Sequence, residues 1–489
     1  METRWGKALS KACSDFKEAG SRIDEMGLRI QVCWTMVLSR LEVAKELEST
    51  MSDDHKHLQQ RTLFVLQGKL EVATLKLSKL ATKPGPPSLM RKLKFVLLRE
   101  TLGEAISELE SWQKLYEPCW FQLIKLAPPS VDVVLNSVIR NGPKATVQTA
   151  TVARKFRRAF KDPAEASGSL FISDEVLSGY TTTEIPFCLT KVATCPGNPR
   201  RFLIDKAAAG AVDRNDAREF AFRLRDADPA TFGLLSCRGV VRSSKADEMA
   251  FLLRVPDQFT AISSVRELLL SGRTHDSLSD RLEMARQLTN AVYYVHLYSF
   301  VHKNIRPETI LSLGRTEDAG LPQTAFLTGF QIIRDAQGRT RPVADMRWEV
   351  NLYRHPQRWG GGAEYFVMQH DIYSLGVCLL EIGLWESFVA YDGNGDAKPA
   401  QTLVDRTHDQ AELQDPTQLK AFLVSLSRSP TLRGKMGTKY GKVVETCLTC
   451  LDQENVDFGN EEDFTDDDGV TVGVRYIEKV LGALDHVSM

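Results

Sequence analysis

The most informative stretch of the sequence is His302-Lys303-Asn304-Ile305-Arg306-Pro307-Glu308-Thr309. It is polar and follows a stripe of apolar residues at helical spacing that runs from Leu278 to Val295. The Asn304 amide carries no charge, so at neutral pH it cannot accept a proton as a carboxylate can. Arg306 retains a positive charge in the stretch, and Thr309 offers a single hydroxyl oxygen.

Three later segments extend this pattern. They are Phe326 to Arg334, which contains Gly329-Phe330-Gln331, then Tyr353-Arg354-His355-Pro356-Gln357, and then His370 to Val377. In order and spacing they resemble the metal-binding segment, the end of the activation segment and the start of the large C-lobe helix of protein kinases. The stretch that begins at His302 resembles the kinase catalytic loop. The resemblance implies a two-lobed α+β protein-kinase-like fold.

The same resemblance implies that the residues of phosphate transfer have been replaced. Asn304 stands at the position of the catalytic base and Arg306 at that of the catalytic-loop lysine, in a loop that His302 opens. Thr309 and Gly329 stand where kinases hold magnesium, and neither offers a good ligand. We therefore expect no magnesium site and impaired catalysis.

Positions that hold the kinase fold together are retained. The resemblance gives structural roles to Asp371, which ties the catalytic loop to the C-lobe helix, and to Phe330 and Pro356. Loss of the catalytic residues with retention of the structural ones is the pattern of a pseudokinase.

Residues 168–260 are expected to form the N-lobe and residues 261–489 the C-lobe. The N-lobe sequence lacks the glycine spacing that covers nucleotide phosphates in kinases. A third strand is predicted at Phe202-Leu203-Ile204-Asp205-Lys206, with Lys206 nearest in role to the kinase strand lysine and the register open by one residue. Glu219 is the candidate partner of Lys206. Either the two side chains form an ion pair, or both are exposed and do not contact each other. ATP binding stays open, and no cofactor is required.

Thr340 lies between Arg339 and Arg341, in the segment that corresponds to the activation loop. A phosphate on Thr340 would organise the two arginines, which makes it a candidate phosphosite. An unmodified loop is the simpler expectation.

Residues 1–140 predict an all-α helical bundle. Apolar residues recur at three- and four-residue steps, and these stripes include Val37, Leu41 and Ile106. We expect them to form the bundle core, with a coiled-coil dimer face as the alternative. Residues 141–167 are expected to be a basic linker, in which Arg154 to Lys161 form a solvated segment or helix face, or contact an anionic membrane.

Composition limits the classes of partner and compartment. The chain has 489 residues and a formal net charge of -1, which gives no electrostatic basis for nucleic-acid binding. Nine cysteines without a signal peptide favour the reducing cytoplasm. No apolar run reaches the length of about 18 residues that a transmembrane helix needs.

The order of the two parts resembles fungal proteins that join a HeLo or prion-inhibition-and-propagation-type helical domain to a kinase-like domain. The layout is also similar to that of mixed lineage kinase domain-like pseudokinases. The resemblance implies a signalling switch or scaffold in self-recognition or cell death, with protein partners, self-association through the bundle and peripheral membrane contact on activation. Met1 to Ser14 is mixed and polar, unlike the apolar N-terminus of the HeLo class.

Two alternatives remain open at this point. The chain is either an unconventional active Ser/Thr protein kinase that binds ATP, or a non-catalytic interaction protein that oligomerises through its helices. The first requires a replacement base and metal ligand that the sequence does not reveal.

Overall fold

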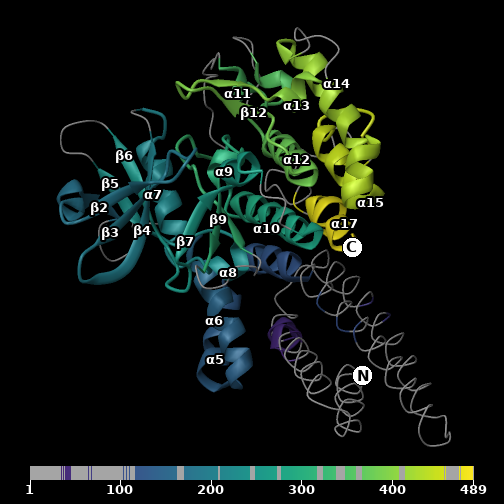
Figure 1. Cartoon of the computed structure of the whole chain (residues 1–489). Coiled ribbons are helices and arrows are strands. Elements are labelled where there is room, and N and C mark those ends of the chain that lie inside the picture. Colours follow the sequence, from purple (N-terminus) through teal and green to yellow (C-terminus); the bar gives the residue numbers. More distant parts are fainter. Residues whose placement is uncertain are drawn as a thin grey trace, which may run out of the picture. The chain divides into compact units, whose positions relative to one another are not determined.

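The computed structural model describes most of residues 116–487 and scattered positions between 35 and 110 (Figure 1). The gaps after residue 116 are 162–169, 208–209, 243–247, 273–276, 316–322, 337–346, 360–365, 407–412, 456, 459–472 and 474. Thr340 and most of the bundle predicted over residues 1–140 lie outside the described residues. The chain divides into two compact units, Met1–Arg157 and Arg158–Met489.

The described part of the first unit is helical. Residues 116–126 form one helix, and α5 (Ser130–Asn141) and α6 (Lys144–Arg158) follow after Pro128 and Pro129. The rings of Phe121 and Phe156 meet edge to face at 5.1 Å. Of the apolar stripes predicted from the sequence, Val37, Leu41 and Ile106 are described, and all three are buried.

The structure differs from the linker expected over residues 141–167, because residues up to Arg158 belong to α6. Phe156 of the basic run is buried, and Arg157 binds the C-terminal end of the helix over residues 116–126. The Arg157 guanidinium donates hydrogen bonds to the carbonyl oxygens of Ile124, Ala127 and Pro128, and pairs with Asp132 at 2.8 Å. Cations stabilise helix C-termini in this way, so Arg157 has a structural role in the first unit.

The second unit begins with a six-stranded sheet of order β1-β5-β6-β4-β3-β2. Its strands are β1 (Phe171–Ser173), β2 (Thr181–Glu184), β3 (Lys191–Cys195), β4 (Asn198–Ala207), β5 (Cys237–Arg242) and β6 (Met249–Arg254). All neighbours are antiparallel except β1 and β5. The strand predicted at Phe202–Lys206 is the second half of β4.

Side chains alternate between the two faces of this sheet. One face carries a small apolar cluster formed by Ala193, Phe202, Ile204, Val241, Ala250 and Leu252. The other face receives Leu203 and Asp205 of β4, both fully buried. Short helices complete this part: η4 (Asp174–Leu177), α7 (Arg214–Arg223) and α8 (Pro229–Phe232).

The remaining residues form a mainly helical part with three small sheets. The helices are α9 (Val265–Leu270), α10 (Leu278–Leu297), η5 (Pro307–Thr309), α11 (Trp348–Asn351), η6 (Pro356–Arg358), α12 (Met368–Leu384), α13 (Gln401–Val404), α14 (Pro416–Ser427), α15 (Pro430–Leu448), η9 (Ile477–Leu481) and α17 (Gly482–Asp485). The strands are β7 (Ala261–Ser264), β8 (Phe300–Val301), β9 (Ile310–Gly314), β10 (Thr324–Leu327), β11 (Arg334–Asp335), β12 (Val389–Tyr391) and β13 (Ala397–Pro399).

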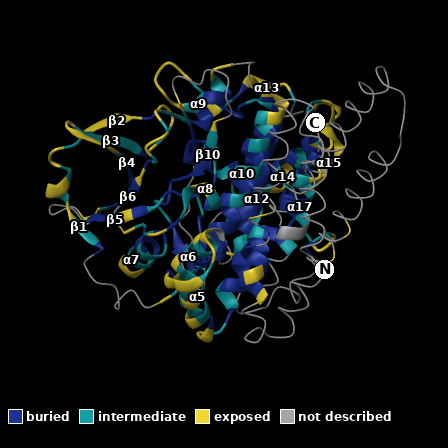
Figure 2. Ribbon diagram, turned by 90° about the horizontal axis from the view of Figure 1, so that it is seen from below, coloured by how far each residue is buried: buried dark blue, intermediate teal, exposed yellow. Residues whose placement is uncertain are grey.

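Helix α12 forms the centre of this part and packs against α10 and α15 (Figure 2). Every residue of α12 after Met368 is buried. A Cβ atom at Gly376 would lie 2.9 Å from the Cβ of Cys447 on α15, so glycine permits the close approach of the two helices. The second unit therefore combines helices with mixed sheets in an α+β arrangement. Among the described residues, no helix has both the length and the apolarity needed to cross a lipid bilayer.

Candidate functional site

One buried carboxylate holds the start of the stretch 302–309 in place. Asp371, in the first turn of α12, accepts hydrogen bonds from the backbone N–H groups of His302 at 2.7 Å and Lys303 at 2.8 Å. Its Oδ2 also lies 3.1 Å from Nε2 of His296. Burial alone would raise the pKa of Asp371, but the bonds from His296 and His302 hold that pKa below its usual value. Asp371 therefore fixes the start of the stretch as a charged acceptor.

His302 is part of the same support. Its Nε2 lies 2.8 Å from the carbonyl oxygen of Thr328, its Nδ1 accepts from the N–H of Asn304, and its ring packs 4.9 Å from that of Phe330. Burial lowers the pKa of His302 to about 4, so the ring is neutral at physiological pH. A neutral ring with both nitrogens bonded positions the loop.

The next three polar groups are bonded to one another. Arg306 Nε donates to Asn304 Oδ1 at 3.1 Å, and Asn304 Nδ2 donates to the carbonyl oxygen of Gly329 at 3.4 Å. The Thr309 hydroxyl lies 2.9 Å from the carbonyl oxygens of both Asn304 and Arg306. The amide at position 304 is thus occupied at both ends, and it provides no base.

Gly329 adopts the left-handed backbone region, with φ +81. A Cβ atom there would lie 2.3 Å from Cγ2 and 2.6 Å from Cβ of Thr309. The Thr309 side chain therefore fills the space that a side chain at position 329 would need. Threonine at 309 and glycine at 329 fit one another, and an aspartate at 329 does not fit beside this threonine.

Asp205 is the residue that the sequence analysis passed over. It lies on β4, is fully buried, and its Oδ2 accepts from the N–H of Gly329 at 2.9 Å and of Phe330 at 2.7 Å. Its Oδ1 lies 3.4 Å from both the Thr190 hydroxyl and the Gln331 amide. Burial raises the pKa of Asp205 to about 6 against the opposing effect of these donors. The carboxylate joins the six-stranded sheet to residues 329–331.

Lys206 does not reach this site, because neighbouring residues of a strand face opposite sides. Lys206 is exposed on β4, and Glu219 on α7 pairs with Arg223 of the same helix at 2.6 Å. Within the described part of the chain, no ion pair joins Lys206 to Glu219. On β4 it is therefore Asp205, one residue before Lys206, that contacts residues 329–331.

A second buried network supports the stretch 302–309 through Glu308. Arg266 on α9 is fully buried and pairs with Glu308 at 3.1 Å and with Glu381 of α12 at 2.8 Å. Its guanidinium also donates to the Tyr353 hydroxyl. Burial opposes the charge of Arg266, but Glu308 and Glu381 raise its pKa well above the usual value. No local sequence pattern predicted this network.

The other structural candidates lie close to these groups. Phe330 is fully buried and packs 4.5 Å from the ring of Phe220 on α7. Pro356 opens the short helix η6 and is half-buried.

No set of three or more His, Cys, Asp or Glu side chains is placed to hold a metal ion among the residues that the structure describes. Comparison with protein-family models and with curated proteins finds no match for this chain.

Proposed function

We propose that the second unit is a catalytically impaired protein-kinase-like domain, a pseudokinase, that acts as a signalling switch or scaffold for the N-terminal helical region. The observation that carries the proposal is the contact of Asp205 with residues 329 and 330. The strand that would supply a cation to nucleotide phosphates supplies a carboxylate instead. The position that would supply the metal-binding carboxylate is a glycine with no room for a side chain.

The proposed nucleotide site thus has a carboxylate where phosphate transfer needs a cation. Transfer depends on positioning and on positive charge that neutralises the phosphates. Here the Asp205 carboxylate would repel those phosphates, and Asn304 accepts no proton. Arg306 retains a cation, but its Nε is bonded to Asn304.

The support of the loop favours a structural role over a catalytic one. Asp371 and Arg266 hold the stretch 302–309 through charged, buried hydrogen bonds, although the stretch lacks the side chains that would act as base and metal ligand. None of residues 302–309 is exposed, so this support maintains the fold of the domain without catalysis, as a scaffold requires. The proposed fold is the two-lobed kinase type. It is supported by the mainly antiparallel sheet, which has α7 between β4 and β5 in the chain, and by the helical part around α12 that follows it.

Phosphate transfer tests the catalytic half of the proposal. The full chain is incubated with γ-labelled ATP and either magnesium or manganese, and transfer to itself and to a generic protein substrate is measured. We expect no transfer above background. Transfer that is lost in an Asn304→Ala variant, with folding intact, would show an active enzyme and refute the proposal.

Vesicle sedimentation tests whether the helical region contacts membranes, as the proposed switch includes. Lys155 and Arg158 are exposed on α6, so Lys155→Glu/Arg158→Glu should reduce sedimentation of the full chain with phosphatidylserine vesicles. Lys144→Glu, at the other end of the same helix, is the matched control. Equal sedimentation of all three proteins would remove this contact from the proposal and leave the pseudokinase part standing.

A further inference from the structure

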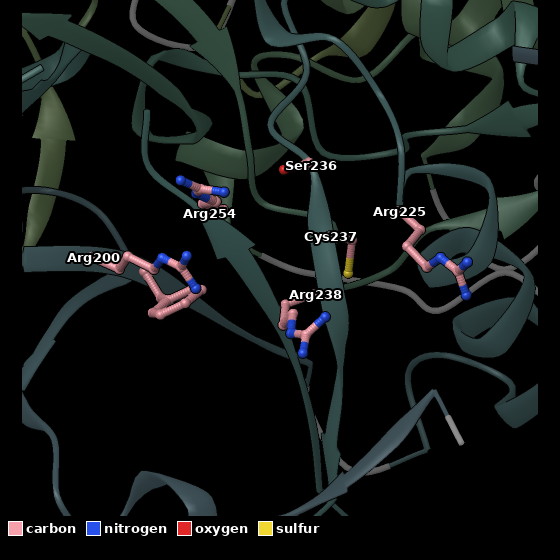
Figure 3. A pocket seen from close by; sticks show the side chains of 7 residues that line it. Arg200, Arg225, Ser236, Cys237, Arg238 and Arg254 are labelled. Carbon is pink, nitrogen blue, oxygen red and sulfur yellow. The ribbon is translucent and has the colours of Figure 1, made fainter. Parts of the chain in front are cut away.

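A pocket of about 230 Å³ lies on the six-stranded sheet and is lined mainly by arginines (Figure 3). Its lining residues are Arg200, Phe202, Arg225, Ser236, Cys237, Arg238 and Arg254. They come from β4, β5 and β6 and from the segment between α7 and β5. In Figure 3, Arg200 and Arg254 lie on one side, Arg225 on the other, and Arg238 beside Cys237 between them. Four arginines thus line one pocket, and in Figure 3 the Arg225 side chain points away from the other three.

These positive charges are largely uncompensated by protein carboxylates. Arg254 pairs with Asp257 at 3.3 Å, an ion pair in which both side chains are exposed. Among the described residues, no carboxylate pairs with Arg200, Arg225 or Arg238. Like charges placed around one small volume repel one another, so an anion in the pocket would relieve an unfavourable arrangement.

A β-bulge creates the position of Arg238. The register of β5 against β6 shifts between Cys237 and Gly239, so Arg238 is the extra residue of the strand. Bulges redirect side chains in this way. The sheet therefore brings Arg238 to the pocket beside Arg254 of the neighbouring strand.

The chemistry of the lining selects the ligand. Guanidinium groups bind phosphate oxygens through paired hydrogen bonds, and one phosphate carries a charge of only about -1.5 to -2 near pH 7. Even after the Asp257 carboxylate that pairs with Arg254 is counted, the positive charge of the arginines exceeds that of one phosphate, so a diphosphate matches it better. Phe202, nine-tenths buried, leaves little apolar surface for the rest of a ligand, and the Ser236 hydroxyl adds one more donor.

We propose that this pocket binds a compact diphosphate or longer polyphosphate group. The site is separate from the one that carries the proposed function, because β4 presents Phe202 to the pocket and Asp205 to the opposite face of the sheet. If an experiment refutes one of the two proposals, the other therefore still stands.

Isothermal calorimetry of the full chain with inorganic pyrophosphate tests this assignment, at constant ionic strength set with sodium chloride. Wild type should bind, and Arg200→Ala/Arg238→Ala should bind at least about tenfold more weakly, since two charge-assisted contacts are lost. Both side chains are exposed, so the variant should fold. Arg242→Ala, an exposed arginine at the other end of β5, is the matched control and should bind within about twofold of wild type.

The source of the phosphates is distinguished by a second titration with ADP. Equal affinity for pyrophosphate and ADP would show that the diphosphate alone is recognised, and tighter binding of ADP that still requires Arg200 and Arg238 would show a nucleotide source. The proposal is overturned by absent pyrophosphate binding up to about 10 mM, or by equal binding in the double variant. Binding of a phosphoserine peptide without any pyrophosphate binding would also overturn it, in favour of a protein partner.

Discussion

Asp205 gives a quantitative prediction that links its burial to stability. Burial raises its pKa from 3.8 to about 6, so the folded protein holds this proton to a higher pH than the unfolded chain does. The contribution of Asp205 to stability therefore falls as the pH rises from about 4 to about 6, and stays low above that. A shift of about two pKa units corresponds to ~3 kcal/mol once the carboxylate is fully ionised.

Asp205→Asn removes the titration while it keeps an acceptor oxygen for the N–H groups of Gly329 and Phe330. We expect this variant to be more stable than wild type at neutral pH, and the difference to grow by about 2 kcal/mol between about pH 4.5 and pH 7. Urea unfolding at each pH, followed by circular dichroism, gives the free energies of unfolding. Comparison with the variant cancels the titration of all other groups.

Asp205→Ala is the companion variant, because it leaves two buried N–H groups without their acceptor. It should be less stable than Asp205→Asn by about 2–4 kcal/mol. Parallel pH profiles of wild type and Asp205→Asn would refute the reasoning, since they would mean that Asp205 titrates equally in the folded and unfolded chain.

Three further substitutions test the support of the loop. Gly329→Ala should lower the free energy of unfolding by about 2–5 kcal/mol in urea denaturation, since it adds a clash to a left-handed backbone. The control Gly210→Ala, at φ +71 with open space around it, should cost only about 1–2 kcal/mol. Equal losses in the two variants would argue against the clash. Arg266→Ala leaves buried carboxylates unpaired and should lower the free energy of unfolding, followed by the thermal midpoint, by about 3–5 kcal/mol. The control Arg242→Ala should cost below about 0.5 kcal/mol. A small loss in both variants would show that the network contributes little. Asp371→Ala should cost about 2–4 kcal/mol at neutral pH. Because the pKa of Asp371 is lowered, that cost should shrink as the pH falls below about 4, and a constant cost would contradict its charged state.

The sequence was informative where the relevant residues are close together along the chain. The stretch 302–309, the strand before Gly329 and the helix that carries Asp371 each have a local pattern. The contacts of Asp371 with residues 302 and 303 follow the role that the resemblance gave it.

Long-range pairings set the remaining features. Asp205 rather than Lys206 faces residue 329 because the register of β4 against β6 fixes which side chains turn inward, and one residue of slip reverses both faces. Arg266 and Glu381 are 115 residues apart, so no local pattern joins them. The basic run that ends α6 was expected in a linker, because the sequence does not reveal that Arg157 binds the carbonyl groups of another helix.

Nucleotide binding with and without magnesium tests the proposed loss of phosphate transfer most directly. A thermal-shift titration with ATP is made on the full chain and on Arg200→Ala/Arg238→Ala, so that the arginine pocket does not contribute to the second series. A ligand that binds only the folded state at about 100 times its Kd adds ~2.7 kcal/mol of stability, which a melting curve readily resolves. The proposal places Thr309 and Gly329 at the metal positions, and the Asp205 carboxylate accepts from the N–H of Gly329. We therefore predict that magnesium causes no additional shift in the double variant. A shift that appears only with magnesium would show a working metal site and contradict the assignment as a pseudokinase.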